Sequence, residues 1–252
     1  MYFMKMTKIL FGISLLLLAS CKQQSGIEKK LSPNFLRYVN PFIGTSNYGA
    51  TNPGAIAPRG MINVSPFNVS GPQNSFEKDS RWLSTPYVYE NTFLTGFSHV
   101  NLSGVGCPDL GVILTMPTNG GLETNPQKYG STYSNEVAKA GYYSTILDKY
   151  DIKVEATATT RTGVSNYFFP KGKSNILINL GLGLTNEQGG SVKVVSSTEI
   201  EGIRQVGSFC YYKPEESYPL YFVAKFSKPS NEFGIWENSV KQKGLESQWM
   251  SY

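Results

Sequence analysis

Residues 152–159 alternate apolar and polar side chains without a fault, in the order IKVEATAT. Strict alternation predicts a half-buried β-strand, because successive side chains of a strand point to opposite faces. Other short segments are also rich in Val, Ile, Thr and aromatic residues, at residues 164–169, 175–180, 191–200, 203–212 and 220–226. Turns rich in Gly and Pro separate these segments, and no helical periodicity intervenes. The sequence therefore predicts an all-β fold, a large antiparallel β-sandwich.

Residues 40–121 have a different composition, dense in Gly, Pro, Asn and Ser and also rich in aromatic residues. We expect this part to be mostly long loops carried by the sandwich, where functional side chains often lie. Neither an internal repeat nor a linker is found after residue 33. The sequence thus predicts one domain over residues 33–252.

The first 20 residues have the pattern of a bacterial lipoprotein signal peptide. Lys5 and Lys8 precede an apolar run over residues 9–19, which is 11 residues long. That length suits a signal-peptide core of about 7 to 15 residues, and a membrane-spanning helix needs roughly 20. The run ends in the sequence LASC, which resembles a lipobox, so we expect Cys21 to be lipidated. Residues 21–32 are polar and predict a flexible tether.

Export implies a protein anchored by lipid to a bacterial outer membrane, on its periplasmic or cell-surface face. In an oxidising compartment Cys107 and Cys210 could form a disulfide, and buried free thiols are the alternative. The chain has a formal net charge of +5, and its lysines and arginines do not cluster into a basic stripe. The charge pattern therefore predicts no nucleic-acid partner.

The sequence contains a single histidine, His99. A zinc site made of several imidazoles is therefore excluded. Any nucleophile activated by histidine would have to use His99 as its base.

Several unusual motifs occur in a fixed order along the chain. They are YVNPFIGT at 38–45, NPGA at 52–55, PRGM at 58–61, GFSHVNLSGVGCPDLG at 96–111, AGYYS at 140–144, TATTRTG at 157–163 and VGSFC at 206–210. In this order and spacing they resemble the N-terminal domain of glycoside hydrolase family 92, the calcium-dependent, exo-acting α-mannosidases best represented in Bacteroidetes. The resemblance runs from about residue 38 to the end of the chain.

The resemblance implies a two-domain enzyme, in which a β-sandwich packs on a C-terminal (α/α)6 barrel and a mannose-containing glycan binds between them. Family members remove terminal mannose with inversion, which needs a carboxylic acid and a separate carboxylate base. In the family both carboxyl groups come from the barrel, and we expect most calcium ligands there too. The sequence ends before such a barrel, so we expect a C-terminally incomplete sandwich, no catalytic residue in this chain and an inactive fragment.

The candidate substrate-binding residues all lie in the loop-rich part of the chain. They are Asn52, Arg81, Trp82, His99, Asn101, Ser103 and Asp109. Trp82 offers a flat apolar face for a sugar ring, or it is a core anchor, and Arg81 could donate to hydroxyls. His99 could bond a mannose hydroxyl, or it braces a loop through the backbone. Asp109 lies in the motif richest in glycine, where the backbone can approach a ligand closely.

Two other functions compete with that of a mannosidase fragment. One is a stand-alone carbohydrate-binding lipoprotein without catalysis, and the other is a purely structural surface sandwich. A reading frame that continues past Tyr252 and encodes barrel carboxylates would favour the enzyme.

Overall fold

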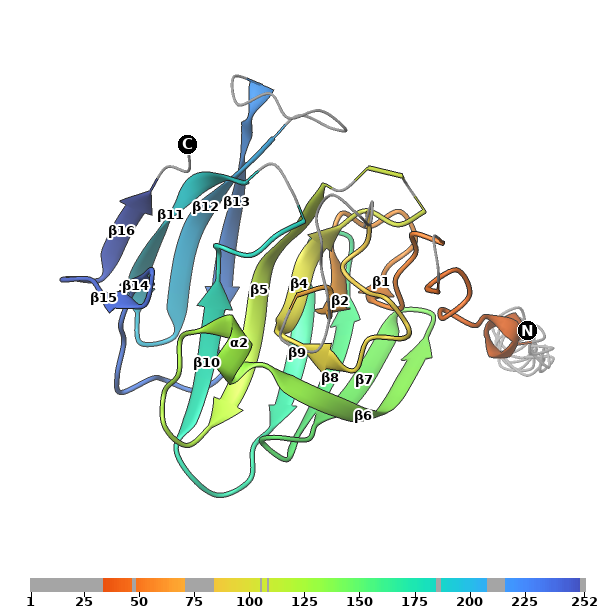
Figure 1. Cartoon of the computed structure of the whole chain (residues 1–252), viewed down its shortest axis with the longest axis horizontal. Helices are drawn as coiled ribbons and strands as arrows, with labels where there is room; N and C mark the ends of the chain where they lie inside the picture. Colours follow the sequence, from red (N-terminus) through yellow and green to blue (C-terminus); the bar gives the residue numbers. More distant parts are fainter. Residues whose placement is uncertain are drawn as a thin grey trace, which may run out of the picture. The chain divides into compact units, whose positions relative to one another are not determined.

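The computed structural model describes residues 34–46, 49–70, 84–104, 106–107, 109–184, 187–207 and 216–249. All of its sheets lie within residues 36–252 (Figure 1). The strands are β1 (Ala55–Ile56), β2 (Asn63–Phe67), β3 (Phe93–Leu94), β4 (Gly96–Asn101), β5 (Leu110–Asn119), β6 (Ser131–Lys139), β7 (Tyr142–Leu147), β8 (Ile152–Ala158), β9 (Gly163–Phe168), β10 (Ser174–Asn179), β11 (Glu187–Ser196), β12 (Glu199–Val206), β13 (Tyr218–Lys225), β14 (Trp236–Glu237), β15 (Val240–Lys241) and β16 (Glu246–Trp249). Two single-turn helices accompany them, η2 (Phe35–Tyr38) and α2 (Pro126–Tyr129).

The strands form four antiparallel sheets. The first has the order β1-β2-β4-β5-β10, and the second has the order β3-β6-β7-β8-β9. A third sheet, β13-β12-β11-β16, and the small ribbon β14-β15 complete the described part. In Figure 1 the strands β6 to β9 lie side by side, as do β11, β12, β13 and β16. The predicted all-β class and antiparallel pairing are confirmed.

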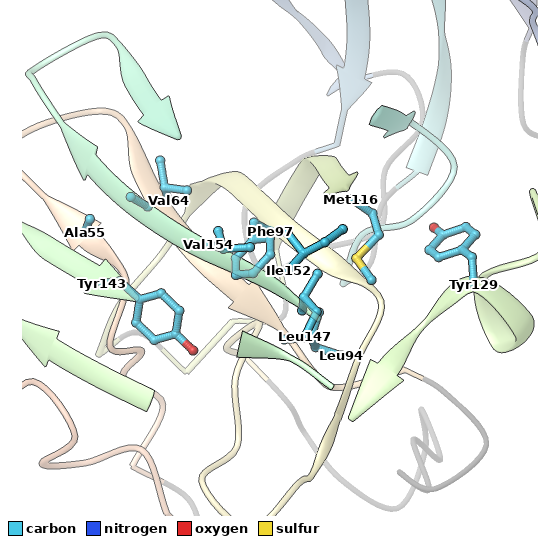
Figure 2. Close-up of a cluster of buried hydrophobic side chains, with 11 residues drawn as sticks. Ala55, Val64, Leu94, Phe97, Met116, Tyr129, Tyr143, Leu147, Ile152 and Val154 are labelled. Carbon is cyan, nitrogen blue, oxygen red and sulfur yellow. The ribbon is translucent and has the colours of Figure 1, made fainter. Parts of the chain in front are cut away.

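The main hydrophobic core joins the first and second sheets. Figure 2 shows this cluster, which includes Phe97 from β4, Met116 from β5, Leu147 from β7 and Val154 from β8. Each of these side chains is at most 1% exposed. Burying one such apolar side chain fully contributes roughly 1.5–3 kcal/mol. A second cluster, with Val112 and Val206, joins the first sheet to the third.

The alternating segments predicted several strands closely. Residues 152–159 correspond to β8, in which Ile152, Val154 and Ala156 are buried and Lys153 is exposed. The prediction was wrong around residues 191–200, because a turn at 197–198 divides that segment between β11 and β12. The segment expected at residues 203–212 likewise begins inside β12, which spans Glu199–Val206.

Residues 40–121 also contain strands that the sequence did not indicate, although strands make up less than half of this region. Five strands, β1 to β5, lie in this region, and β5 alone has 10 residues. All five residues of β2 are buried. A strand covered on both faces has no polar side to alternate with an apolar one, so its sequence gives no period-2 signal.

The predicted signal peptide (1–20) and tether (21–32), with Cys21, lie outside the described residues. In the part of the chain that the structure describes, no helix has the length and apolar character needed to cross a bilayer.

Candidate functional site

Three of the sequence motifs meet in one group of loops, which we call the loop cluster (residues 43–46, 49–54 and 101–109 where described). The Thr51 amide donates to the Gly44 carbonyl at 3.2 Å, and the Thr51 hydroxyl donates to the Ile43 carbonyl at 2.9 Å. The Gly104 amide donates to the Ala50 carbonyl at 2.7 Å. Motifs that are about 50 residues apart in the chain therefore form one surface.

A buried amide network holds this cluster together. Asn52 is 8% exposed, and its Nδ2 donates to the Leu102 carbonyl at 3.2 Å. Its Oδ1 accepts from the Gly54 amide at 3.1 Å and from Nδ2 of Asn63 at 2.9 Å. The Asn101 side chain donates to the Asn63 carbonyl at 2.7 Å. Asn63 thus links two residues that the sequence had marked, Asn52 and Asn101.

Asn101 has a second set of contacts within its own strand. Its Oδ1 accepts from the hydroxyl of Ser98 at 2.7 Å, and Ser98 is fully buried. These bonds fix the Asn101 side chain at the end of β4. Since the amide groups of Asn52 and Asn101 are engaged with protein atoms, their shown role is to shape the loops.

His99 lies half-buried on β4 and is bound to the neighbouring strand. Its Nδ1 lies 2.8 Å from the Ile113 carbonyl, so the tautomer with a proton on Nδ1 donates this bond. Desolvation by burial lowers the pKa of His99 below its ordinary value of 6.5, although hydrogen bonds to the backbone at Ile113 and Phe97 oppose the shift. The imidazole is therefore neutral at pH 7. His99 is satisfied by the backbone, as one alternative expected, but by a carbonyl of strand β5 and not of a loop, and contact with a sugar stays a prediction.

The remaining motif residues differ in exposure. Ser103 is exposed, and Asp109 is only 5% exposed. The Asp109 amide donates to the Cys107 carbonyl at 2.9 Å, which tightens the turn between them. Cys107 is disulfide-bonded, so the alternative of a free thiol is wrong for this residue. Cys210, Arg81 and Trp82 lie outside the described residues.

A second polar group, which the sequence did not mark, surrounds Glu136 on β6. The hydroxyl of Tyr143 donates to Glu136 Oε1 at 2.6 Å, and the hydroxyl of Tyr87 donates to Oε2 at 2.9 Å. Both tyrosines are 0% exposed. Desolvation raises the pKa of Glu136, and the two tyrosine hydroxyls oppose that shift. Nothing in the local sequence could have shown this, because Tyr87 lies 49 residues away from Glu136.

The calcium ion that the resemblance implies, with ligands expected mainly in the barrel, stays a prediction. Among the described residues, no three or more His, Cys, Asp or Glu side chains are grouped so that they could hold a metal ion. These residues do not form a carboxylate-rich calcium site of the usual kind.

Comparison with known proteins gives a consistent result. Residues 38–250 match the family model described as the glycosyl hydrolase family 92 N-terminal domain. A family GH92 α-mannosidase from Bacteroides thetaiotaomicron is similar over 86% of this chain and 30% of its own, with 29% sequence identity and a TM-score of 0.73. The same enzyme in complex with mannoimidazole gives a TM-score of 0.72.

Two more solved structures extend the similarity. The GH92 family glycosyl hydrolase ccman5 shares 26% identity with a TM-score of 0.71, over 85% of this chain and 29% of its own. A family GH92 inverting mannosidase of Bacteroides thetaiotaomicron shares 22% identity with a TM-score of 0.66, over 85% of this chain and 28% of its own, and shows the fold alone. No curated protein sequence gives a match. The chain spans about 30% of the length of the solved structures that it matches.

Proposed function

The chain belongs to glycosyl hydrolase family 92, as its N-terminal domain, and from this premise we propose that it shapes the mannoside-binding cleft of an inverting exo-α-mannosidase. The observation that carries the proposal is the loop cluster, in which the motifs at 38–45, 52–55 and 96–111 meet on one surface. Ser103 and the loop backbone around Gly104 are among the exposed groups there. They would contact sugar hydroxyls, and the amide network would keep them in place.

The chemistry of inversion assigns the remaining roles. A carboxylic acid must protonate the leaving oxygen and a carboxylate must activate water on the opposite face, with roughly 6.5–9.5 Å between the two groups. We propose that both carboxyl groups, and the ligands of a calcium ion, belong to a C-terminal barrel against which this domain packs. A bound calcium ion would help to distort the sugar. Asn52, Asn101, Asp109 and His99 would then position the cleft wall, and Arg81 and Trp82 would contact the glycan.

The activity of the 252-residue chain tests this proposal. We expect no hydrolysis of an aryl α-mannoside or of mannobiose in the presence of calcium, and we expect weak binding of mannobiose in calorimetry. Turnover by these residues alone would contradict the assignment of the catalytic groups to another domain. Absence of binding, with a folded protein, would contradict the role of the domain in shaping the cleft.

A stand-alone carbohydrate-binding lipoprotein is the second candidate, and one observation is compatible with it as well as with the first. In the described part of the loop cluster, Asp109 is the one acidic side chain, so these loops offer hydroxyl and amide contacts without an acid and base pair. Sequencing the gene downstream of the codon for Tyr252 separates the two candidates. A continuing frame with barrel carboxylates supports the enzyme, and a stop codon supports the binding protein.

We also propose that residues 1–20 are removed on export, that residues 21–32 form a tether to the domain at 33–252, and that lipidated Cys21 anchors the protein to the outer membrane. Lipidation explains why a Cys directly follows the apolar run and its small residues. In a bacterial host, we expect the protein in the membrane fraction and expect Cys21→Ser to release it. A Cys21→Ser protein that stays fully membrane-bound would argue against the anchor.

A further inference from the structure

A cavity of about 350 Å³ opens beside Glu136, where residues of the motif at 38–45 lie close to strand β6. We call it the Glu136 pocket, and its lining residues are Asn40, Phe42, Ile43, Ser46, Tyr89 and Glu136. Its volume lies at the lower end of the range of small-ligand sites, which is roughly 300–1,000 Å³. The pocket is large enough for a single sugar ring.

The carboxylate of Glu136 accepts hydrogen bonds from two buried tyrosines, and none of the ion pairs among the described residues includes it. Tyr143 donates to Oε1 and Tyr87 to Oε2, so the two buried hydroxyls fix its orientation. An ionised carboxylate has about four lone-pair sites, and these two bonds use only half of them. Desolvation by burial raises the pKa of Glu136, so burial disfavours its charged form, and the bonds from Tyr143 and Tyr87 oppose that shift.

The walls of the pocket are aromatic and aliphatic. The rings of Phe42 and Tyr89 meet edge to face, with their centroids 5.9 Å apart. Tyr89 is 56% exposed and Ile43 is 73% exposed, so both present apolar surface to a ligand. An aromatic ring offers a flat apolar face with a polar edge. Such a face suits the C–H side of a pyranose ring.

Polar groups complete the lining. Asn40 uses its Oδ1 to accept from the Phe42 amide at 3.0 Å, and its Nδ2 group remains available as a donor. Ser46 adds a hydroxyl. The pocket thus combines one oriented acceptor, an amide, a hydroxyl and an exposed aromatic ring.

We propose that the Glu136 pocket binds one pyranose residue of a neutral glycan, in which two adjacent hydroxyls donate to the Glu136 carboxylate and the ring lies against Tyr89. Adjacent hydroxyls of a pyranose can donate to the two oxygens of one carboxylate together, as a bidentate pair. The negative charge disfavours acidic sugars, because no basic group of the lining would compensate a second carboxylate. Mannose is chosen as the first probe because of the proposed function. The existence of the pocket does not depend on that function.

Calorimetric titration of the full chain, solubilised in detergent, with methyl α-mannoside and with mannobiose tests the proposal. We expect a dissociation constant in the millimolar range, weakened at least about tenfold (1.4 kcal/mol) in Glu136→Gln and in Tyr89→Ala. Tyr89→Ala keeps the test valid if Glu136→Gln fails to fold, because the Tyr89 side chain is exposed. Glu237→Gln is the matched control, because Glu237 is exposed at the far ribbon β14-β15 and should bind as the unaltered chain does.

The other outcomes are equally distinct. Unchanged affinity in both pocket variants, with affinity lost in Ser103→Ala, would overturn the pocket proposal and leave the proposed role of the loop cluster intact. Affinity lost only in the pocket variants would support the pocket and weaken the proposed function. Much tighter binding of glucosamine than of mannose, abolished in Glu136→Gln, would identify a site for ammonium groups and would also overturn the proposal. Absence of sugar binding by the folded, unaltered chain would overturn it as well.

Discussion

Nδ2 of Asn63 donates a 2.9 Å hydrogen bond to Oδ1 of Asn52, inside the network that carries the loop cluster. Asn52 was marked by its motif and Asn63 was not. Oδ1 of Asn63 is buried and has no hydrogen-bond partner among the described residues. Asn63 therefore serves as a donor to the loops, and its own carbonyl accepts from Asn101.

Replacement of Asn63 by alanine removes the bond to Asn52 and leaves a buried acceptor short of a donor. We expect Asn63→Ala to lower the free energy of unfolding by about 1–3 kcal/mol and to weaken mannobiose binding. Chemical denaturation and calorimetry measure the two effects. The control is Asn166→Ala on β9, where the side chain is exposed and the change should be within about 0.5 kcal/mol. Equal stability of the two variants would contradict the role of Asn63.

Gly54 is required for close packing in the loop cluster. A Cβ at this position would lie 2.0 Å from Oδ1 of Asn63 and 2.8 Å from Cβ of Ser65. We expect Gly54→Ala to cost about 1–3 kcal/mol in the free energy of unfolding, because the buried neighbours must move. Gly121→Ala is the control, since a Cβ there would meet nothing within 4 Å. A Gly54→Ala protein as stable as the control would show that the loops can relax.

His99 makes the stability of the fold depend on pH. Its pKa is lowered from 6.5 in the folded state, so below pH 6.5 the unfolded state binds more protons than the folded state. The stabilisation from neutral His99 is thus present above pH 6.5 and is lost as the pH falls from there toward the folded pKa. The slope contributed by this one group is at most about 1.4 kcal/mol per pH unit.

The variant His99→Gln tests this dependence. Glutamine does not titrate and keeps an N–H that can donate to the Ile113 carbonyl. We expect denaturation curves between pH 5 and about pH 7 to show a smaller loss of stability on acidification than in the unaltered chain. Glu136 titrates in both proteins, so its contribution cancels in the comparison. An unchanged slope would mean that His99 is protonated at little cost.

Leu147 lies at the centre of the main core and is 0% exposed. Leu147→Ala leaves a cavity between the first and second sheets, so we expect a loss of about 2–5 kcal/mol in the free energy of unfolding. Val164 on β9 is 50% exposed, and Val164→Ala should change stability by no more than about 0.5 kcal/mol. Thermal and chemical denaturation of both variants measure the difference. Similar losses in both would place the core elsewhere.

The sequence predicted the half-buried strands best. In β8 the pattern of buried and exposed side chains follows the alternation of IKVEATAT, because one face meets the core and the other meets solvent. β2 and much of β5 were missed, because their residues are buried on both faces and composition there does not alternate. The resemblance to family 92 identified the domain because several motifs occur in a fixed order.

The sequence marked residues of the candidate site by their motifs. The structure brings Asn52, Asn101, Ser103 and Asp109 together in the loop cluster, and their contact with a sugar stays a prediction. The partners of these residues could not be read from the sequence. Asn52 and Leu102 are 50 positions apart, and the contact between Tyr87 and Glu136 spans 49 positions. Contacts over such separations are fixed by strand pairing and sheet packing, which leave no local pattern.

The amino-acid sequence by itself determined the all-β class, the family and the group of motifs from which the loop cluster is made, because alternation and motif order are local properties of the chain. The tertiary structure decided which side chains meet. It alone placed Asn63 between Asn52 and Asn101, and it alone brought two buried tyrosine hydroxyls to Glu136 beside an aromatic pocket. The physical reason is that a buried polar group must find its hydrogen-bond partner in space, from whichever strand the packing brings near.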